Sequence, residues 1–447
     1  MNVRKLCLIT LLVLLVGQLA FAQMAPNRTM ASKAITAVQT TGKPVPVVPR
    51  TTFNCTSKAR PTIWLSRSLG SKPTMVAGEP WFCDYNTGYQ IAVCPKGLQT
   101  AYQTNFPSAN GGAGMVIAIV DFFSYPSAEA NFAQFNTDMH LPACTTANGC
   151  FQSVDISNGN DGTGTGWDLE SMLDIEYAHS MAPNAKIVYI QGDPYSYGTE
   201  AESIAALGCP ASPYCSYYGI TYAIPPADVV SNSWTFFAGE IPSLDPGWNL
   251  GKPLMFASGD GSAFPYYSVT SYPCTSAYVT CVGGTSLYLN PNLTRSAEYG
   301  WAGAGGGCSE NFGTPGWQGN VGSGVCSPYR AAPDVAAIAD GNTPVAVYIC
   351  NIYWSCGYYG VGGTSVATPV TAGLVADIDT ARVAFGKAKL TFLDSEYYAA
   401  ATYNYNYYFY DVTVGYNGYY AGPQYDLITG LGVTSGKAIG SSFFGIP

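Results

Sequence analysis

Residues 362–369 read Gly-Gly-Thr-Ser-Val-Ala-Thr-Pro and lead into the apolar run Val-Thr-Ala-Gly-Leu-Val-Ala-Asp-Ile at residues 370–378. The run predicts a helix, and the glycine turn before it would place Ser365 at the helix N-terminus. Free backbone N–H groups and the helix dipole favour developing negative charge there. Ser365 is therefore a candidate nucleophile of a hydrolase, and a serine nucleophile needs a base.

The chain has 447 residues, and its first 22 have the pattern of an export signal. Arg4 and Lys5 precede a short apolar run, and residues 20–22 form a small-residue cleavage site. No later apolar run is long enough to span a membrane, so we expect a secreted, extracellular protein without membrane contact after signal cleavage. Residues 23–90 are predicted to be an extended leader or a reduced prosegment, and residues 91–447 a single catalytic domain.

Charged residues make up only 11% of the chain, and acidic residues outnumber basic ones by 28 to 19. This balance argues against nucleic-acid binding, which needs clustered Lys and Arg. A chain with few basic groups also has little positive self-repulsion when its carboxylates protonate, so it suits an acidic medium. Many secreted proteins are acidic without working in acid, so the acidic composition of this chain can also be unrelated to its working pH.

The spacing of the cysteines supports export. Cys7 leaves with the signal, and twelve of the remaining thirteen fall into close sequential pairs. Such short loops predict disulfides in an oxidising compartment, and the pairs are Cys83/Cys94, Cys144/Cys150, Cys209/Cys215, Cys274/Cys281, Cys308/Cys326 and Cys350/Cys356. Cys55 has no such partner, and neither a C-x-x-C pair nor a histidine-rich cluster indicates zinc.

Strongly apolar segments alternate with helical ones from about residue 97 onward. A helix is predicted at residues 127–135, and buried strands are predicted at residues 115–121, 185–190, 228–234 and 253–258. Continuous apolar strands separated by helices indicate an α/β fold, with a parallel sheet covered by helices on both faces. Sites in such folds gather at the carboxyl ends of the strands. The tyrosine-rich tail at residues 397–425 is predicted to be strand and loop on the surface.

The candidate nucleophile lacks an obvious histidine partner. Neither His140 nor His179 sits in a glycine-flanked turn at a strand end, so each is interpreted as a structural or surface residue. Glu170 and Asp174 lie four positions apart in a helix predicted after the glycine-rich loop 159–166, so both carboxyls fall on one helical face. Their repulsion should raise one pKa and let the pair share a proton. Such a pair is usually a solvated helix face, but apolar neighbours make that interpretation less favourable here.

Asp260 lies in a glycine turn after the strand predicted at residues 253–258. A carboxylic acid that stays protonated can donate a hydrogen bond to an oxyanion. Asp260 is therefore a candidate oxyanion donor. The alternative is an aspartate that only caps a turn.

Six short segments together resemble the sedolisin family, the serine-carboxyl peptidases with a subtilisin-like fold. Each is weak alone, but their joint occurrence in the family's order is specific. They are Glu-Ser-Met-Leu-Asp at 170–174, Ala-Pro-Asn-Ala at 182–185, Val-Ser-Asn-Ser-Trp at 230–234, Phe-Ala-Ser-Gly-Asp at 256–260, Tyr-Val-Thr-Cys-Val-Gly-Gly-Thr-Ser at 278–286 and Gly-Thr-Ser-Val-Ala-Thr-Pro at 363–369. The resemblance implies a subtilisin-like parallel sheet in one peptidase domain, which cleaves protein or peptide substrates through an acyl-enzyme.

The resemblance also implies roles for individual residues. The nucleophile, general base, orienting acid and oxyanion donor of a Ser-Glu-Asp triad with a fourth acid would be Ser365, Glu170, Asp174 and Asp260. Glu170 would later act as the acid that protonates the leaving amine. Asp121 and Trp234 are expected in an outer hydrogen-bond network that supports the acids.

A calcium site near the C-terminus is implied as well. Its side-chain ligands would be Asp411 and Asp426, and its carbonyl ligands Val412, Gly422 and Gln424. Such hard oxygen donors are the ligands that Ca²⁺ takes. Gln424 stands where the family usually has glycine, so its carbonyl is expected to ligate only if the loop does not require a positive φ. The alternative is a turn-rich surface loop that binds nothing.

We expect a secreted, monomeric endopeptidase that works at acidic pH, because Asp260 must be protonated to donate. One alternative is a tripeptidyl-type exopeptidase with the same chemistry. Another is a catalytically silent extracellular binding or structural protein on the same fold. Family members commonly carry a longer N-terminal prodomain, so the short leader here predicts a reduced prosegment or a protein that folds without one.

Overall fold

The computed structural model describes residues 59–61, 63–70, 75–76, 79–85, 90–104, 111–236, 239–264, 271–319, 321, 323–350 and 355–436. The predicted signal peptide, the leader before residue 59 and Cys55 lie outside the described residues. Every residue predicted for the catalytic and calcium sites lies within them.

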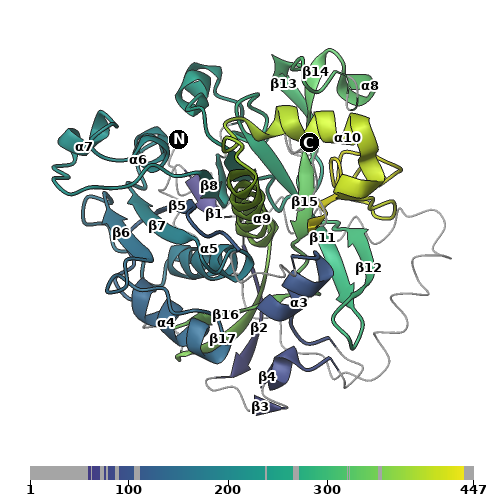
Figure 1. Ribbon diagram of the computed structural model, residues 1–447. Helices are drawn as coiled ribbons and strands as arrows, with labels where there is room; N and C mark the ends of the chain where they lie inside the picture. Colours follow the sequence, from purple (N-terminus) through teal and green to yellow (C-terminus); the bar gives the residue numbers. More distant parts are fainter. Residues whose placement is uncertain are drawn as a thin grey trace, which may run out of the picture. The chain divides into compact units, whose positions relative to one another are not determined.

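A mainly parallel sheet forms the centre of the fold (Figure 1). Its strands run in the order β18-β19-β15-β11-β10-β8-β5-β7-β6, and β12 pairs with β11 beside this path. Neighbours from β19 to β6 are parallel, whereas β12 and β18 pair antiparallel. The bounds are β5 Val116–Phe122, β6 Phe151–Asp155, β7 Lys186–Gly192, β8 Val229–Asn232, β10 Leu254–Ala257, β11 Thr280–Leu289, β12 Arg295–Gly300, β15 Val335–Ile338, β18 Phe409–Tyr410 and β19 Val433–Thr434.

Side chains of the sheet alternate between two cores. Ile117 and Ile119 of β5 join one core, and Ala118 and Val120 join the other. The first core lies under α3 (Pro95–Ala101), α4 (Ala128–Asp138), α5 (Trp167–Met181) and α9 (Thr364–Ala384). The second lies under α6 (Thr199–Leu207) and the 3-10 segment η3 (Pro242–Trp248). Because helices cover both faces, the strands can be apolar throughout, and the predicted α/β fold is confirmed.

The four predicted strands are present as β5, β7, β8 and β10. The third ends at Asn232 rather than at the predicted Trp234, because the chain leaves the ladder at Ser233 and starts β9 (Trp234–Phe236). The predicted helix at residues 127–135 is α4, which continues to Asp138. These boundary shifts do not change the architecture.

Helices α5 and α9 lie side by side on one face of the sheet (Figure 1). They pack tightly at Gly373, where a Cβ atom would lie 2.5 Å from the Cβ of Met181. A larger residue at position 373 would force the helices apart. The candidate acids and the candidate nucleophile lie nearer the N-terminal ends of these two helices.

The tyrosine-rich tail begins as a helix, which corrects the prediction of strand and loop. Helix α10 spans Leu393–Tyr408, with a kink at Asn404, and the strand β18 follows it. Helical spacing explains the difference, because burial of one face outweighs the modest helix propensity of Tyr and Asn. The buried residues recur every three or four positions, at Leu393, Tyr397, Tyr398, Ala400, Ala401, Tyr405 and Tyr408.

All six predicted disulfides are present in the described residues. The smaller elements that they fasten lie at the margins of the sheet. These are α7 Tyr214–Tyr217, α8 Ser323–Cys326, the antiparallel pair β13 Gly307–Gly313 and β14 Tyr329–Ala332, and the antiparallel pair β16 Val345–Ile349 and β17 Gly357–Gly362.

The described part of the leader pairs with strands of the catalytic region. β1 (Ala59–Pro61) is antiparallel to β9, and β2 (Trp64–Gly70) is antiparallel to β17. A short hairpin of β3 (Met75–Val76) and β4 (Glu79–Pro80) follows, then the 3-10 turn η2 (Trp81–Cys83). The predicted boundary at residue 90 stays a prediction.

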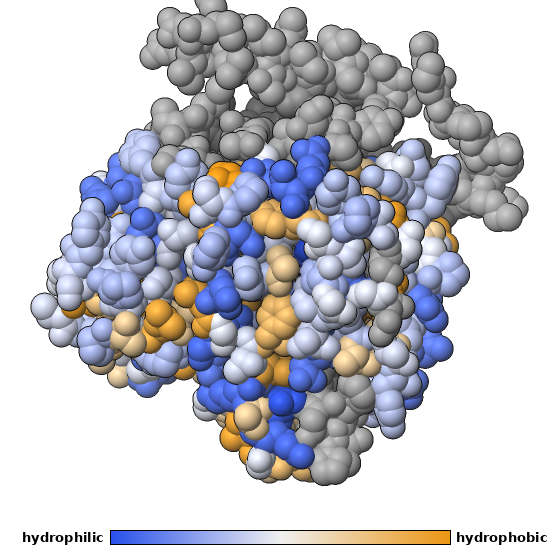
Figure 2. Space-filling view, turned by 90° about the horizontal axis from the view of Figure 1, so that it is seen from above, coloured by the Kyte–Doolittle hydropathy of each residue, from blue (hydrophilic) through white to orange (hydrophobic). Residues whose placement is uncertain are grey.

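Polar residues cover most of the described surface seen in Figure 2, and apolar residues gather in a central strip. Among the described helices, none has both the length and the apolar character that crossing a membrane requires.

Candidate active site

The four residues predicted for catalysis come from three segments of the chain. Glu170 and Asp174 lie on the buried helix α5, Asp260 follows the carboxyl end of β10, and Ser365 is the second residue of α9. The turn before α9 needs a glycine, since Gly363 has a φ of +121°. The structure therefore brings the helix N-termini and a strand end together at one edge of the sheet.

Ser233 joins the nucleophile to the acids. Its hydroxyl donates to Oδ1 of Asp174 at 2.8 Å and lies 3.2 Å from the carbonyl oxygen of Ser365. In return, Oγ of Ser365 lies 3.4 Å from the carbonyl oxygen of Ser233. Ser233 is not among the predicted site residues. The signal was present, because this serine lies in the segment 230–234 that contributed to the resemblance.

Glu170 is completely buried, and neither of its carboxylate oxygens has a hydrogen-bond partner of good geometry. Burial raises the pKa of Glu170 well above its usual range, and the charges of Asp174 and Asp121 raise it further. The hydroxyl of Ser365 acts in the opposite direction, and Asp260 adds a weaker increase. The charges that raise the pKa of Glu170 are those of other carboxyls, so its carboxyl gains protons readily.

Asp121 and Asp174 complete a group of buried acids around Glu170. Burial raises the pKa of Asp174 well above its usual range, Asp121 raises it further, and the hydroxyl of Ser233 lowers it. Burial also raises the pKa of Asp121, at the end of β5. Three carboxyls so close in low dielectric cannot all ionise, so they share protons.

Trp234 lies beside this group but does not bond to an acid. Its indole N–H donates to the carbonyl oxygen of Val120 at 2.9 Å. Of the two residues expected to support the acids, Asp121 acts through its charge on Glu170 and Asp174. Trp234 instead holds the end of β5 through its hydrogen bond to the backbone of Val120.

Asp260 is held by the residue before the nucleophile. Its Oδ1 accepts hydrogen bonds from the backbone N–H of Thr364 at 2.8 Å and from the hydroxyl of Thr364 at 2.9 Å. Gly259 in turn donates its N–H to Oγ1 of Thr364 at 3.0 Å. Oδ2 of Asp260 has no such partner. Loss of hydration raises the pKa of Asp260 to about 7, although Thr364 lowers it, so the free oxygen carries a proton in acid.

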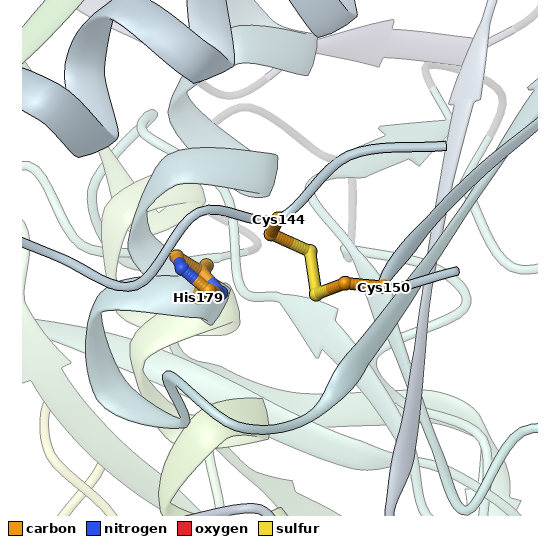
Figure 3. Close-up of side chains that lie close together, drawn as sticks. All are labelled: Cys144, Cys150 and His179. Carbon is orange, nitrogen blue, oxygen red and sulfur yellow. A yellow bond between two sulfur atoms is a disulfide. The ribbon is translucent and has the colours of Figure 1, made fainter. Parts of the chain in front are cut away.

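The two histidines lie away from this group. His140 is exposed in the turn after α4. His179 is buried at the end of α5, where Nε2 lies 2.9 Å from the carbonyl oxygen of Pro142, and burial lowers its pKa to about 4. Figure 3 shows His179 beside Cys144 and Cys150. These sulfurs form a disulfide, so they offer no thiolate to a metal.

The leader strand β1 runs along the site. It pairs with β9, which follows Ser233 directly, and places Ala59 opposite Phe236 and Pro61 opposite Trp234. The chain then reaches β2, where Trp64 is opposite Gly362. Residue 362 comes just before the turn that carries Ser365. The leader backbone therefore pairs first with the strand that follows Ser233 and then with the strand that precedes Ser365.

The predicted calcium ligands lie around the hydroxyl of Tyr405. This hydroxyl donates to Oδ1 of Asp411 at 3.1 Å and lies 3.2 Å from the carbonyl oxygen of Gln424. The N–H of Gln424 donates to both oxygens of Asp411. Gln424 has a φ of +65°. Its carbonyl was expected to ligate only if the loop did not require a positive φ, and that condition is not met. A glutamine sustains this left-handed conformation at a cost of about 1 kcal/mol.

Asp426 accepts four hydrogen bonds. Oδ1 accepts the N–H groups of Ile428 and Thr429, and Oδ2 accepts the N–H of Gly422 and the hydroxyl of Thr429. The donor set is of the type that Ca²⁺ takes. A bound ion would replace one of the two longer bonds to Oδ2, at 3.1 and 3.2 Å.

Comparison with known proteins identifies the family. The sequence profile of the subtilase family (Peptidase_S8) matches residues 156–391. The chain belongs to the subtilase family. The matched range contains Glu170, Asp174, Asp260 and Ser365.

Two individual proteins are similar to this chain over much of its length. The chain is 29% identical to kumamolisin of Bacillus sp. (strain MN-32) over 376 residues, covering 76% of this chain and 62% of that protein. It is 29% identical to tripeptidyl-peptidase 1 of Bos taurus over 306 residues, covering 61% of this chain and 51% of that protein. It thus spans less than two thirds of the length of either relative.

A solved structure of Pseudomonas sedolisin, a serine-carboxyl proteinase, covers 77% of this chain and 95% of its own, with a TM-score of 0.58 and 22% identity. This likeness shows the fold. The chain is thus a member of the subtilase family that is similar in sequence to kumamolisin and tripeptidyl-peptidase 1 and has the fold of the solved sedolisin.

Proposed function

We propose that this protein is a secreted endopeptidase that hydrolyses proteins or peptides at acidic pH through an acyl-enzyme on Ser365. The observation that carries the proposal is the surroundings of Ser365, where the titratable groups are carboxyls and both histidines lie elsewhere. A histidine base is protonated in acid, whereas a carboxyl with a raised pKa still exchanges protons there. Six disulfides fit an extracellular site of action.

In the first half-reaction Oγ of Ser365 attacks the carbonyl carbon of the scissile peptide bond. The carboxylate of Glu170 takes the hydroxyl proton, and Asp174 and Asp121 retain theirs, which limits repulsion around the new charge. Protonated Glu170 then donates to the leaving amine, and the C–N bond breaks. Water hydrolyses the resulting ester with Glu170 again as base.

Asp260 supplies the oxyanion donor in this mechanism. Its Oδ1 is anchored by Thr364, which leaves protonated Oδ2 as the group that faces the developing negative charge. Since the pKa of Asp260 is raised to about 7, the donor is present in acid and is lost as the pH passes through neutrality. Turnover should therefore fall as the pH rises toward 7 and above.

A tripeptidyl-type exopeptidase is the second candidate. The likeness to tripeptidyl-peptidase 1 favours it. Matched peptides with free and acetylated N-termini separate the two activities. An endopeptidase cleaves both at internal bonds, whereas an exopeptidase releases tripeptides from the free form alone.

The leader is proposed to be a reduced prosegment. Support comes from β1, which occupies the open side of β9 next to Ser233, and from the path of the chain to β2. An extended substrate would pair with β9 in the same place. Activation would then release residues 59–61 from β9, and N-terminal sequencing of acid-treated protein would locate the cleavage.

Ca²⁺ is proposed as a stabilising ion at Asp411 and Asp426, with the carbonyls of Val412 and Gly422. When bound, it would neutralise two carboxylates and fasten the loop to Tyr405. Chelation should lower the melting temperature of the wild type, and Asp411→Asn should abolish that chelator effect. An unchanged melting temperature in chelator would contradict the site.

The main test compares wild type with Ser365→Ala on a denatured protein between pH 3 and pH 8. The wild type should cleave with a maximum below neutral pH, and the variant should lose about 10⁴-fold or more in rate. Cleavage by the variant at the wild-type rate would contradict the proposal. A folded wild type that forms no adduct with a serine-directed probe would instead favour a silent binding protein.

A further inference from the structure

A pocket lined by tyrosines lies beside the proposed active site and has no part in the chemistry. Its volume is about 460 Å³. Five aromatic side chains line it, namely Tyr195, Tyr197, Tyr214, Tyr217 and Tyr218, together with the acids Asp193 and Glu200. No basic side chain is among its described lining residues. We call it the tyrosine pocket.

The pocket is built from two rigid segments. One is the turn after β7, where Oδ2 of Asp193 accepts the amide of Asn158 at 2.7 Å and Oδ1 accepts the N–H of Tyr195 at 2.9 Å. The other is α7, which the Cys209–Cys215 disulfide ties to the end of α6. Hydroxyls of Ser203 and Ser212, 2.9 Å apart, add a second link. The aromatic walls are therefore positioned before any ligand arrives.

Its walls combine exposed aromatic faces with negative charge. Tyr217 is 78% exposed and Tyr195 49% exposed. The ring of Tyr217 lies at 88° to that of Tyr218, with centroids 4.9 Å apart. Both Asp193 and Glu200 act on the hydroxyl of Tyr218, whose pKa burial raises most and these charges raise further. Tyrosine faces and carboxylates both attract an ammonium or guanidinium group.

The pocket adjoins the strand on which a substrate would lie. Tyr197 packs edge-on against Phe236 of β9, with ring centroids 5.7 Å apart. The leader strand β1 places its N-terminal residue, Ala59, opposite Phe236, and Pro61 opposite Trp234, nearer Ser233. A substrate that follows the same direction would bring residues N-terminal to the scissile bond past Tyr197.

We propose that the tyrosine pocket binds the side chain of a lysine or arginine a few residues N-terminal to the scissile bond. The proposal rests on the peptidase function proposed above and on substrate pairing with β9. It makes the enzyme selective for substrates with a basic residue upstream of the cleavage site.

The test is a set of peptides in which one upstream position at a time is lysine, arginine or the uncharged norleucine. The wild type should cleave the basic peptides about five- to tenfold faster in kcat/KM at one position. Tyr217→Ala and the double variant Asp193→Asn/Glu200→Gln should lose that preference and keep their rate on the norleucine peptide. Tyr403→Ala, which removes a 73% exposed tyrosine on α10, is the control and should keep the preference.

Each outcome bears on one claim. No cleavage of any peptide by folded wild type would contradict the proposed function. Cleavage without a basic preference, or with a preference that Tyr217→Ala retains, would overturn the pocket proposal alone. The melting temperatures of Tyr217→Ala and Tyr403→Ala should match the wild type, because both side chains are at the surface.

Discussion

Two clusters of buried acids lie at opposite edges of the central sheet. Asp260 follows the carboxyl end of β10, close to Ser365 and Glu170. Asp334 precedes β15 and accepts the N–H of Cys281 near the amino end of β11. The first cluster has no positive charge among the groups that act on Glu170, whereas Arg330 lies within the second.

In the second cluster Asp334 and Arg330 satisfy their hydrogen bonds, whereas Oδ2 of the neighbouring Asp394 has no partner of good geometry. Arg330 donates to Oδ2 of Asp334 at 2.6 Å and to the carbonyl oxygens of Ser276 and Val279. Oδ1 of Asp334 accepts the hydroxyl of Tyr398 at 2.9 Å. Burial raises the pKa of Asp334, and the Arg330 charge acts against it. Such a set of bonds belongs to a structural ion pair.

The first cluster leaves acceptors without partners. Both oxygens of Glu170, both oxygens of Asp121 and one oxygen each of Asp174 and Asp260 lack a hydrogen bond of good geometry. Unpaired buried acids destabilise a fold, so their retention calls for a chemical reason. The two clusters differ in the Arg330 cation, which pairs with Asp334, whereas the acids near Ser365 have no such partner and are proposed to transfer protons.

The largest expected effect is on catalysis by Glu170. Glu170→Gln keeps the shape of the side chain but removes the base, so kcat/KM should fall about 10³- to 10⁴-fold. The matched control is Glu176→Gln on the same helix, since the Glu176 carboxyl is also buried and accepts the N–H of Tyr348. The control should retain its rate within about twofold. Equal losses of kcat/KM in Glu170→Gln and Glu176→Gln would mean that removing any buried carboxylate of α5 lowers the rate, and would contradict the role of Glu170 as the base.

Removal of the oxyanion donor comes next. Asp260→Ala should lower kcat about 10²- to 10³-fold. Asp260→Asn keeps a donor at every pH, so its rate should decline less between pH 6 and pH 8 than that of the wild type, whose Asp260 has a pKa of about 7. Rate profiles of the three proteins measure this. Identical profiles for wild type and Asp260→Asn would remove Asp260 from the explanation of acid activity.

In the second cluster the expected effect is on stability. Arg330→Met leaves Asp334 buried and unpaired, which should cost about 3–5 kcal/mol of unfolding free energy. Chemical denaturation measures the loss. Activity per folded molecule should stay unchanged, because the cluster lies at the edge away from Ser365. A large drop in kcat without a drop in stability would contradict the division between the clusters.

The smallest expected effect is the pH dependence of stability. Acids with raised pKa values bind more protons in the folded state than in the unfolded state, where carboxyls titrate near pH 4. The unfolding free energy of the wild type should therefore fall as the pH rises from about 4 to about 7, where Asp260 titrates. Glu170→Gln should make this decline shallower. Thermal unfolding at several pH values would show it, and a rise in stability over this range would contradict the shifted pKa values.

Much of the fold could be predicted because its strands are continuously apolar. The run at residues 115–121 has no polar face, so it needs helices on both sides, and the sheet has them. The helix α10 was missed because tyrosine and asparagine are weak indicators of helix, and its buried face appears only in the folded chain.

The candidate site could be predicted in part. Glu170 and Asp174 stand out through their spacing, and Ser365 through its glycine turn. The role of Ser233 depends on a contact between residues 59 positions apart, which no local pattern reveals. The same holds for the bond from Thr364 to Asp260 and for the leader strand beside β9. Such contacts follow from topology and not from spacing along the chain.

The central claim is that a carboxyl, and not a histidine, activates Ser365. Its most direct test is the rate at which a peptide phosphonate ester labels the serine between pH 3 and pH 8, with the adduct located by mass spectrometry. We predict labelling of Ser365 that is fastest below pH 7 and at least about 100-fold slower in Glu170→Gln. Labelling of Glu170→Gln at the wild-type rate, or a wild-type rate that climbs steadily through pH 8, would contradict the account.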